Sequence, residues 1–302
     1  IEHISELKSQ GAKIIKGDNI KAMEQAAKPE LMRKNLGLKM IRRANSIGHH
    51  YFIANLTSKD IASSVALAVN EKHGIWYNPM TGEYHEATIG DKGIQLNLKS
   101  GESRILITSN KPVNEWKLGS KVKVNEKEAI AAADSKTIDL TENAWKLSFT
   151  EDAPKVGETF NLKGVKSWEG LSEKAKVMMG TGVYETTIKL SKDDAKKQWT
   201  IDLGDVRESA RVYVNNKYIG CAWAVPYILN CKDALNKGKN TIRIEVTNLP
   251  ANRIAEMDRQ GVKWRKMKDI NVVDINYKKT TYENWTPVSS GLNSTVKLVE
   301  IK

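Results

Sequence analysis

The fold is decided between residues 182 and 249, a stretch that opens with GVYETTIKL (182–190), in which polar and apolar residues largely alternate. Similar short runs follow after turns rich in Asn, Gly and Lys, which is typical of consecutive antiparallel β-strands. The predicted strands are residues 183–190, 199–203, 210–214, 217–222 and 241–247. This pattern predicts a jelly-roll sandwich, a scaffold that often handles sugars, and the last strand of that sandwich is expected over residues 295–301.

Alternation also predicts which side chains face the core of this sandwich. In the first strand Tyr184 and Ile188 fall on the same face, and in the second Trp199 falls with Ile201. Burying each large apolar side chain contributes about 1.5–3 kcal/mol to folding. Trp199 is therefore assigned to the core and excluded as a ligand-binding ring.

Composition limits the classes of protein to which the chain can belong. It has 302 residues, 40% hydrophobic and 28% charged, which is the balance of an ordinary globular protein with room for two domains. The net charge of +12 is spread along the sequence, so a lysine-rich solvated surface is favoured over a nucleic-acid interface. No apolar run approaches the roughly 20 residues that span a bilayer.

The rest of the chain divides into two further segments. Residues 1–30 read as a helix that ends near Gly11 and a short strand over 12–15, which is typical of a βα unit in a parallel sheet and predicts the end of a larger α/β domain. Residues 31–137 predict a small antiparallel β-sandwich, which leaves 138–302 for the jelly roll. The strands predicted for this sandwich are residues 39–43, 50–55, 64–69, 93–98 and 103–108. The fold class is therefore mainly β.

The sequence names no catalytic residue. Glycoside hydrolysis needs two carboxyl groups about 5–10 Å apart, and no pair of acids stands out around the jelly roll. The histidines lack a metal-binding spacing, and no compact acidic loop identifies the structural calcium ion that jelly rolls of this type often carry. Cys221 and Cys231 either pair across the segment between them or remain free thiols.

Several motifs resemble the galactose-binding-like sugar-binding domain of family 2 glycoside hydrolases, and more closely that of bacterial α-L-rhamnosidases of glycoside hydrolase family 106. The similar residues of the jelly roll are 182–187, 203–210, 212–217, Gly220, 223–227, 238–240, 245–248, 252–253, 285–287 and 290–292. Upstream, residues 42–43 and 51–55, with Trp76, Pro79, Thr81 and Gly82, are similar to the sandwich that follows the catalytic barrel in that family.

This resemblance implies a C-terminal accessory part of a bacterial secreted or periplasmic glycoside hydrolase that acts on plant or host glycans. Its expected partners are an oligosaccharide or polysaccharide and the N-terminal catalytic barrel of the same polypeptide, which would hold the catalytic carboxylates. The resemblance implies that residues 1–30 are the remnant of this upstream α/β catalytic domain. The alternative is a stand-alone carbohydrate-binding or adhesion module without enzymatic activity. Whether the chain is an enzyme stays open.

Sugar binding needs aromatic rings for the apolar faces of pyranoses and polar groups for their hydroxyls. Trp223 and Tyr227 are candidates, although their rings could instead plug the end of the sandwich as the chain crosses between sheets. Trp264 lies in a polar stretch and is expected to be exposed. The polar candidates Asn248, Asn252 and Arg253 follow a strand end, and an interdomain salt bridge is an equal alternative for the arginine.

Overall fold

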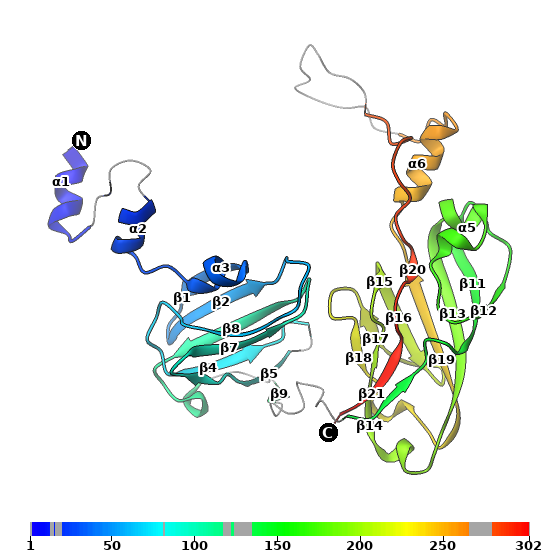
Figure 1. Ribbon diagram of the computed structural model, residues 1–302, viewed down its shortest axis with the longest axis horizontal. Helices are drawn as coiled ribbons and strands as arrows, with labels where there is room; N and C mark the ends of the chain where they lie inside the picture. The colour runs from blue at the N-terminus through cyan, green and yellow to red at the C-terminus, as the bar shows by residue number, and fades with distance from the viewer. Residues whose placement is uncertain are drawn as a thin grey trace. The chain divides into compact units, whose positions relative to one another are not determined.

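The computed structural model describes residues 2–12, 15, 20–80, 82–116, 122–123, 135–265 and 280–301 (Figure 1). It is mainly β, which confirms the predicted fold class. The chain forms two compact units, Ile1–Glu126 and Lys127–Lys302, and each is described by itself. The three-part division that the sequence predicts remains a prediction, and most of residues 117–134, around the division into units, lie outside the described residues.

Short helices open the first unit. They are α1 (Glu2–Ser9), α2 (Ile20–Ala26) and α3 (Leu31–Leu36). The predicted helix is present as α1 and is followed by Gly11 at φ 86°, as expected for a helix C-terminus. Half of the strand predicted over 12–15 lies outside the described residues. The apolar side chains of α1 and α2 are exposed, among them Leu7 and Ile20.

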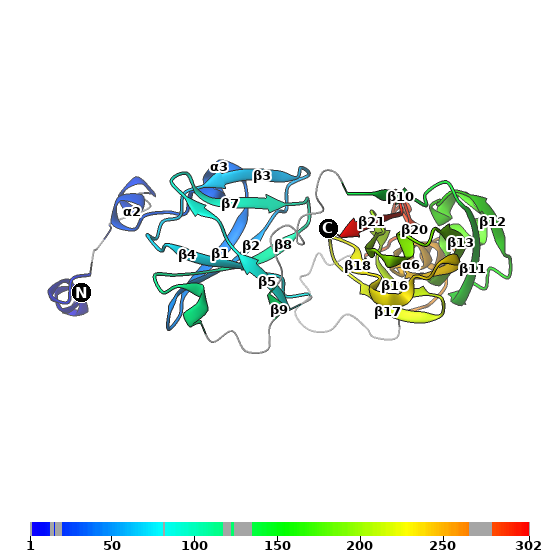
Figure 2. The same ribbon diagram turned by 90° about the horizontal axis from the view of Figure 1, so that it is seen from below.

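The first unit is a sandwich of a larger and a smaller sheet (Figure 2). The larger has the order β1 (Lys39–Ala44), β2 (Gly48–Ala54), β8 (Ser103–Ser109), β4 (His73–Tyr77), β5 (Glu83–Glu86) and β9 (Val122–Lys123). The smaller has the order β3 (Ile61–Val65), β7 (Gly93–Leu98) and β6 (Ile89–Gly90), and the 3-10 turn η1 (Val113–Glu115) follows β8.

One strand differs from its prediction because its partner ends. Residues 64–69 were expected to be extended, but β3 covers Ile61–Val65, paired from Ile61 opposite Leu98 to Val65 opposite Ile94. The partner strand β7 begins at Gly93, where φ is 98°, so β7 does not extend alongside the residues that follow Val65.

The second unit holds the predicted jelly roll. Its larger sheet has the order β12 (Phe160–Lys163), β11 (Ala144–Ala153), β13 (Met179–Leu190), β19 (Gly238–Thr247), β16 (Ser209–Val214) and β17 (Lys217–Ala222). The opposing sheet has the order β10 (Thr137–Asp139), β21 (Lys297–Ile301), β14 (Gln198–Asp202) and β18 (Ile228–Asn230), and β15 (Val206–Arg207) pairs with β20 (Gly291–Leu292). Short helical elements are η2 (Trp168–Gly170), α5 (Glu173–Val177), η3 (Asp194–Lys196), η4 (Lys232–Ala234) and α6 (Ala251–Arg259).

Large aromatic side chains fill the jelly-roll core, and each polar ring atom has a partner. Trp199 is fully buried, as its alternation predicts, and its Nε1 donates to the Asp194 carbonyl at 2.8 Å. Trp168 Nε1 donates to the Tyr184 hydroxyl at 2.7 Å. A buried indole or phenol without such a bond would carry a desolvation penalty, so these contacts fix how the rings pack.

Candidate functional site

Strand register brings distant parts of the sequence to one end of the jelly roll. Ser209 lies opposite Thr247, Ala210 lies opposite Ala222, and Thr181 also lies opposite Thr247. The chain therefore leaves β17 and β19, and enters β13 and β16, at the same end. We call this end the α6 rim and define it as residues 178–180, 205–208, 223–227, 248–265 and 280–293. The predicted site residues all fall within these ranges.

The segment 223–227 crosses between the two layers, since β17 belongs to one sheet and β18 to the other. Trp223 has 62% of its surface exposed, so it does not plug the sandwich. Tyr227 is partly buried against the core, and its carbonyl accepts the Leu203 amide at 3.0 Å. The two rings thus differ: Trp223 is available to a ligand, whereas Tyr227 anchors the crossing segment.

Charged residues border Tyr227 on this rim. Arg207 donates both Nε and an Nη nitrogen to the carboxylate of Asp205, at 2.7 and 2.9 Å. Burial raises the pKa of the Tyr227 hydroxyl above its ordinary value, and the negative charges of Glu208 and Asp205 raise that pKa further against the opposing effect of Arg207. The hydroxyl is therefore a neutral hydrogen-bond group at physiological pH.

The two candidate asparagines on the rim are engaged in internal hydrogen bonds. Asn252 is 4% exposed, and its amide both donates to the Val288 carbonyl and accepts the Val288 amide, each at 2.8 Å. Asn248 accepts from the Gly180 amide and donates to the Met178 carbonyl and the Ser290 hydroxyl. These bonds tie together segments that are far apart in the sequence. Sugar binding by either side chain remains a prediction.

Trp264 belongs to an aromatic cluster, formed by Trp264, Tyr282 and Trp285 beyond the end of α6. Its Nε1 donates to an Asp258 carboxylate oxygen at 2.7 Å, and the other oxygen accepts the Tyr282 amide at 2.8 Å. Trp264 is half-buried, so the expectation of an exposed ring is wrong. The hydrogen bond to Asp258 fixes the indole against α6. Trp285 is 50% exposed, and its ring lies 4.4 Å from that of Tyr282 between centroids.

A groove of about 580 Å³ lies between α5 and α6 and borders the α6 rim, which supplies the lining residues from α6 and Pro287. Arg253 lines it, together with Arg259 and Glu256 from α6. Pro250 precedes the helix α6, whose Asn252 and Ala255 are buried three residues apart. The same spacing in Arg253, Glu256 and Arg259 marks the outer face, and it is the signal in the sequence that could have identified this groove.

Glu169 is a partly buried acid that sequence analysis did not single out. Its Oε1 is shielded from solvent and has no hydrogen-bond partner within the described part of the chain, while Oε2 accepts from Ser167. Burial raises the pKa of this carboxyl, although hydrogen bonding with Ser290 lowers it. Its hydrogen-bonding neighbours are Ser167 and Ser290, so the arrangement is that of a partly buried group beside the core.

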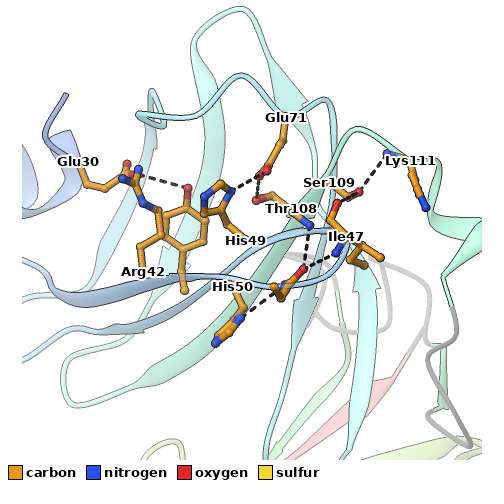
Figure 3. A network of polar contacts seen from close by, with 12 residues as sticks. Glu30, Arg42, Ile47, His49, His50, Glu71, Thr108, Ser109 and Lys111 are labelled. Carbon is orange, nitrogen blue, oxygen red and sulfur yellow. Dashed lines mark hydrogen bonds and ion pairs between the residues drawn. The ribbon is translucent and has the colours of Figure 1, made fainter. Parts of the chain in front are cut away.

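The first unit has its own network of buried polar contacts (Figure 3). Glu30, at the start of α3, accepts from Arg42 at 2.5 Å, from the Tyr51 hydroxyl at 3.2 Å and from the Ala68 amide at 3.0 Å. Figure 3 shows Glu71 reaching both His49 Nδ1, at 2.7 Å, and the Thr108 hydroxyl. These contacts join strands β1, β2 and β8 to the segments that cover them.

Metal ligands and thiols add no site on the described residues. No group of three or more His, Cys, Asp or Glu side chains converges there, so no ligands are identified for the calcium ion that the sequence left possible. Both cysteines are free, with Cys221 exposed and Cys231 buried, which settles the pairing that the sequence left open. Within the described parts of the chain, no helix is both long and apolar enough to cross a membrane.

Comparisons with known proteins agree with this fold. The chain is 27% identical over 232 residues to a putative beta-glucuronidase from Formosa agariphila, a match that covers 68% of this chain and 20% of that protein. A rhamnosidase from Novosphingobium sp. PP1Y has a similar structure, with a TM-score of 0.62, 20% identity, and coverage of 95% of this chain and 26% of that one. A Bifidobacterium dentium beta-glucuronidase is more distant, at a TM-score of 0.40 and 17% identity over 56% of this chain and 31% of its own.

The chain thus spans about a fifth of the curated relative and about a quarter of the rhamnosidase. Within it, residues 171–290 match a family model described as the glycosyl hydrolase 2 galactose-binding domain-like family. This range covers β13 to α6 and nearly all of the α6 rim. The second unit therefore contains a galactose-binding-like domain of the glycosyl hydrolase 2 type.

Proposed function

We propose that this chain is the accessory, carbohydrate-facing part of a bacterial secreted or periplasmic glycoside hydrolase of the α-L-rhamnosidase type. The observation that carries the proposal is the α6 rim of a domain matched to the glycosyl hydrolase 2 galactose-binding family. Exposed aromatic rings from two loop segments and cationic side chains of α6 lie on that rim, which is the composition of a sugar-binding surface.

The chemistry of hydrolysis is assigned to residues outside this chain. The relatives are much longer than the part matched here, which leaves room in them for a catalytic domain. The exposed apolar side chains of α1 and α2 support further packing partners for the first unit, because isolated helices this short do not bury such residues on their own. The catalytic barrel that the family resemblance implies would supply both the partners and the carboxylates.

Turnover assays test this assignment directly. The 302-residue chain is incubated with chromogenic aryl α-L-rhamnoside and aryl β-D-glucuronide, since the names of its relatives point to both sugars. We expect release of the chromophore at the rate of buffer alone. Hydrolysis above that rate by chain purified to homogeneity would place the catalytic groups within these residues and would overturn the proposal.

A stand-alone carbohydrate-binding or adhesion module is the second candidate, and the exposure of Trp223 and Trp285 favours it. In that case the chain alone binds neutral glycans through a platform of rings. Replacing Trp223 or Trp285 with Ala would then weaken binding about five- to thirtyfold, since a stacked ring contributes about 1–2 kcal/mol. Trp264→Ala would act indirectly, because its indole is held by Asp258.

A further inference from the structure

The groove between α5 and α6 has a cationic lining. Among its described lining residues, Lys174 and Lys176 come from α5 and Arg253 and Arg259 from α6, against the acids Glu173 and Glu256. Its volume of about 580 Å³ is in the range of small-molecule sites, which run from about 300 to 1,000 Å³. The groove is therefore large enough for a saccharide unit and carries an excess of positive charge.

Each acid that lines the groove already has a hydrogen-bond or ion-pair partner within the chain. Glu256 accepts from Arg259 Nε at 2.9 Å and from the Gln260 side-chain amide at 2.6 Å. Glu173 lies 3.9 Å from Lys176, a weak pair on the surface. The remaining cations are Arg253 and Lys174, and neither side chain makes a hydrogen bond or ion pair with any residue that the structure describes. Their charges are thus left for a ligand.

The groove also adjoins the aromatic cluster. Arg259 uses a second nitrogen, Nη1, to donate to the Glu283 carbonyl at 3.0 Å, which holds the segment carrying Trp285 against α6. Pro287, two residues beyond Trp285, lines the groove itself. The Trp285 ring, which could contact the apolar face of a pyranose, therefore adjoins the groove, whose arginine guanidinium groups could bind an anion.

We propose that this groove binds a saccharide unit that bears a fixed negative charge, either a uronic-acid carboxylate or a sulfate ester. Arg253 binds two oxygens of the anion at once, because its planar guanidinium matches that geometry, and Lys174 adds a point charge. The inference rests on the proposed function, since it names the class of glycan that the carbohydrate-facing domain selects.

Isothermal titration of the 302-residue chain with matched tetrasaccharides tests this selection. The probes are a glucuronate-containing tetrasaccharide, the same compound with its carboxyls reduced to alcohols, the reduced compound carrying one 6-sulfate ester, and sodium sulfate alone. We expect one or both of the charged saccharides to bind at least tenfold more tightly than the reduced form, and the stronger of them identifies the anion. Equal binding of charged and reduced forms, or sulfate alone binding as tightly as the saccharides, would overturn the proposal.

Charge-removing variants locate the binding. Arg253→Gln and Lys174→Gln should each reduce the affinity for the charged saccharide at least fivefold and leave the affinity for the reduced form unchanged. Arg211→Gln on β16 is the matched control, because Arg211 is 58% exposed and lies outside the groove, and it should bind like the parent chain. Unaltered affinity in both groove variants refutes the assignment.

The outcomes separate this inference from the proposed function. Neutral saccharides that bind the chain equally well, with no effect of Arg253→Gln, leave a carbohydrate-facing domain but no anion selection. Turnover of aryl glycosides would instead overturn the proposed function, whatever the groove binds.

Discussion

Gly182 offers a sharp test of how the jelly-roll core is packed. A methyl group at this position in β13 would lie 2.5 Å from Cζ2 and 2.9 Å from Cε2 of Trp168, whereas carbon atoms in contact prefer about 3.5–4.0 Å. The indole would have to retreat by about 1 Å. It cannot do so freely, because Trp168 is fully buried, bonds Tyr184 at 2.7 Å and packs edge-on against Phe149 with centroids 5.2 Å apart.

Gly182→Ala should therefore destabilise the second unit by about 2–4 kcal/mol, of which overpacking contributes about 1–3 and loss of the Trp168–Tyr184 hydrogen bond about 1. For a domain of this size the melting temperature should fall by about 5–15 °C. Urea denaturation followed by tryptophan fluorescence measures the change. Gly170→Ala is the control, because no atom lies within 4 Å of its added methyl group, and it should shift stability by less than about 0.5 kcal/mol. Equal stability of the two variants would refute the packing argument.

Further predictions concern the thiols and one rim contact. At pH 8, Ellman's reagent should modify one thiol in the native chain, none in Cys221→Ser and two in urea, because Cys221 is exposed and Cys231 is buried; modification of two native thiols would contradict this. Burial raises the pKa of Cys231 to about 12 from an ordinary value of 9.0, so the unfolded chain releases this proton first and the free energy of unfolding falls as pH rises above about 9. Compared with Cys231→Ala, the parent chain should lose about 1.4 kcal/mol of stability by pH 10, and an identical pH slope in both would argue against the raised pKa. Asn252→Ala should lower the free energy of unfolding by about 2 kcal/mol, since both hydrogen bonds between the Asn252 side chain and the Val288 backbone are lost. The segment around Val288 should then become accessible to limited proteolysis, and an unchanged digestion pattern would contradict the role given to these hydrogen bonds.

The strands of the jelly roll could be predicted from the sequence because one face of each is buried. The residues predicted for the strand at 217–222 are those of β17, and Ile242, Ile244 and Val246 of β19 are all buried as their alternation requires. A one-residue slip would turn every such side chain outward, so the hydrophobic pattern specifies these strands strongly.

The α6 helix was not predicted, because most of its residues are polar and its outer face is charged. Pro250 and the buried Ala255 indicate a helix in hindsight, but helices this short depend on packing more than on propensity. Residues 144–153 were also missed as a strand, since β11 is bent by an irregularity between Thr150 and Ala153.

The candidate site was predictable as a set of loop residues but not as an arrangement. The strand ends gave Trp223, Asn248 and Arg253, and register then placed them on one rim. The sequence could not show that Asn248 makes internal hydrogen bonds to backbone and side-chain partners, or that Arg253 lines a groove together with lysines of α5. Both depend on contacts between segments far apart in the sequence, which local patterns do not encode.

Strand order in the second unit has a consequence for its synthesis. Strand β21 lies between β10 and β14, so the earliest strand of this sheet is joined to the others through one of the last to be made. Strand β10 (Thr137–Asp139) therefore lacks its partner in this sheet until β21 (Lys297–Ile301) has been synthesised and has left the ribosome. The sheet therefore closes only after translation of the whole unit, and nascent chains that stop short of β21 expose an open edge to chaperones and to one another.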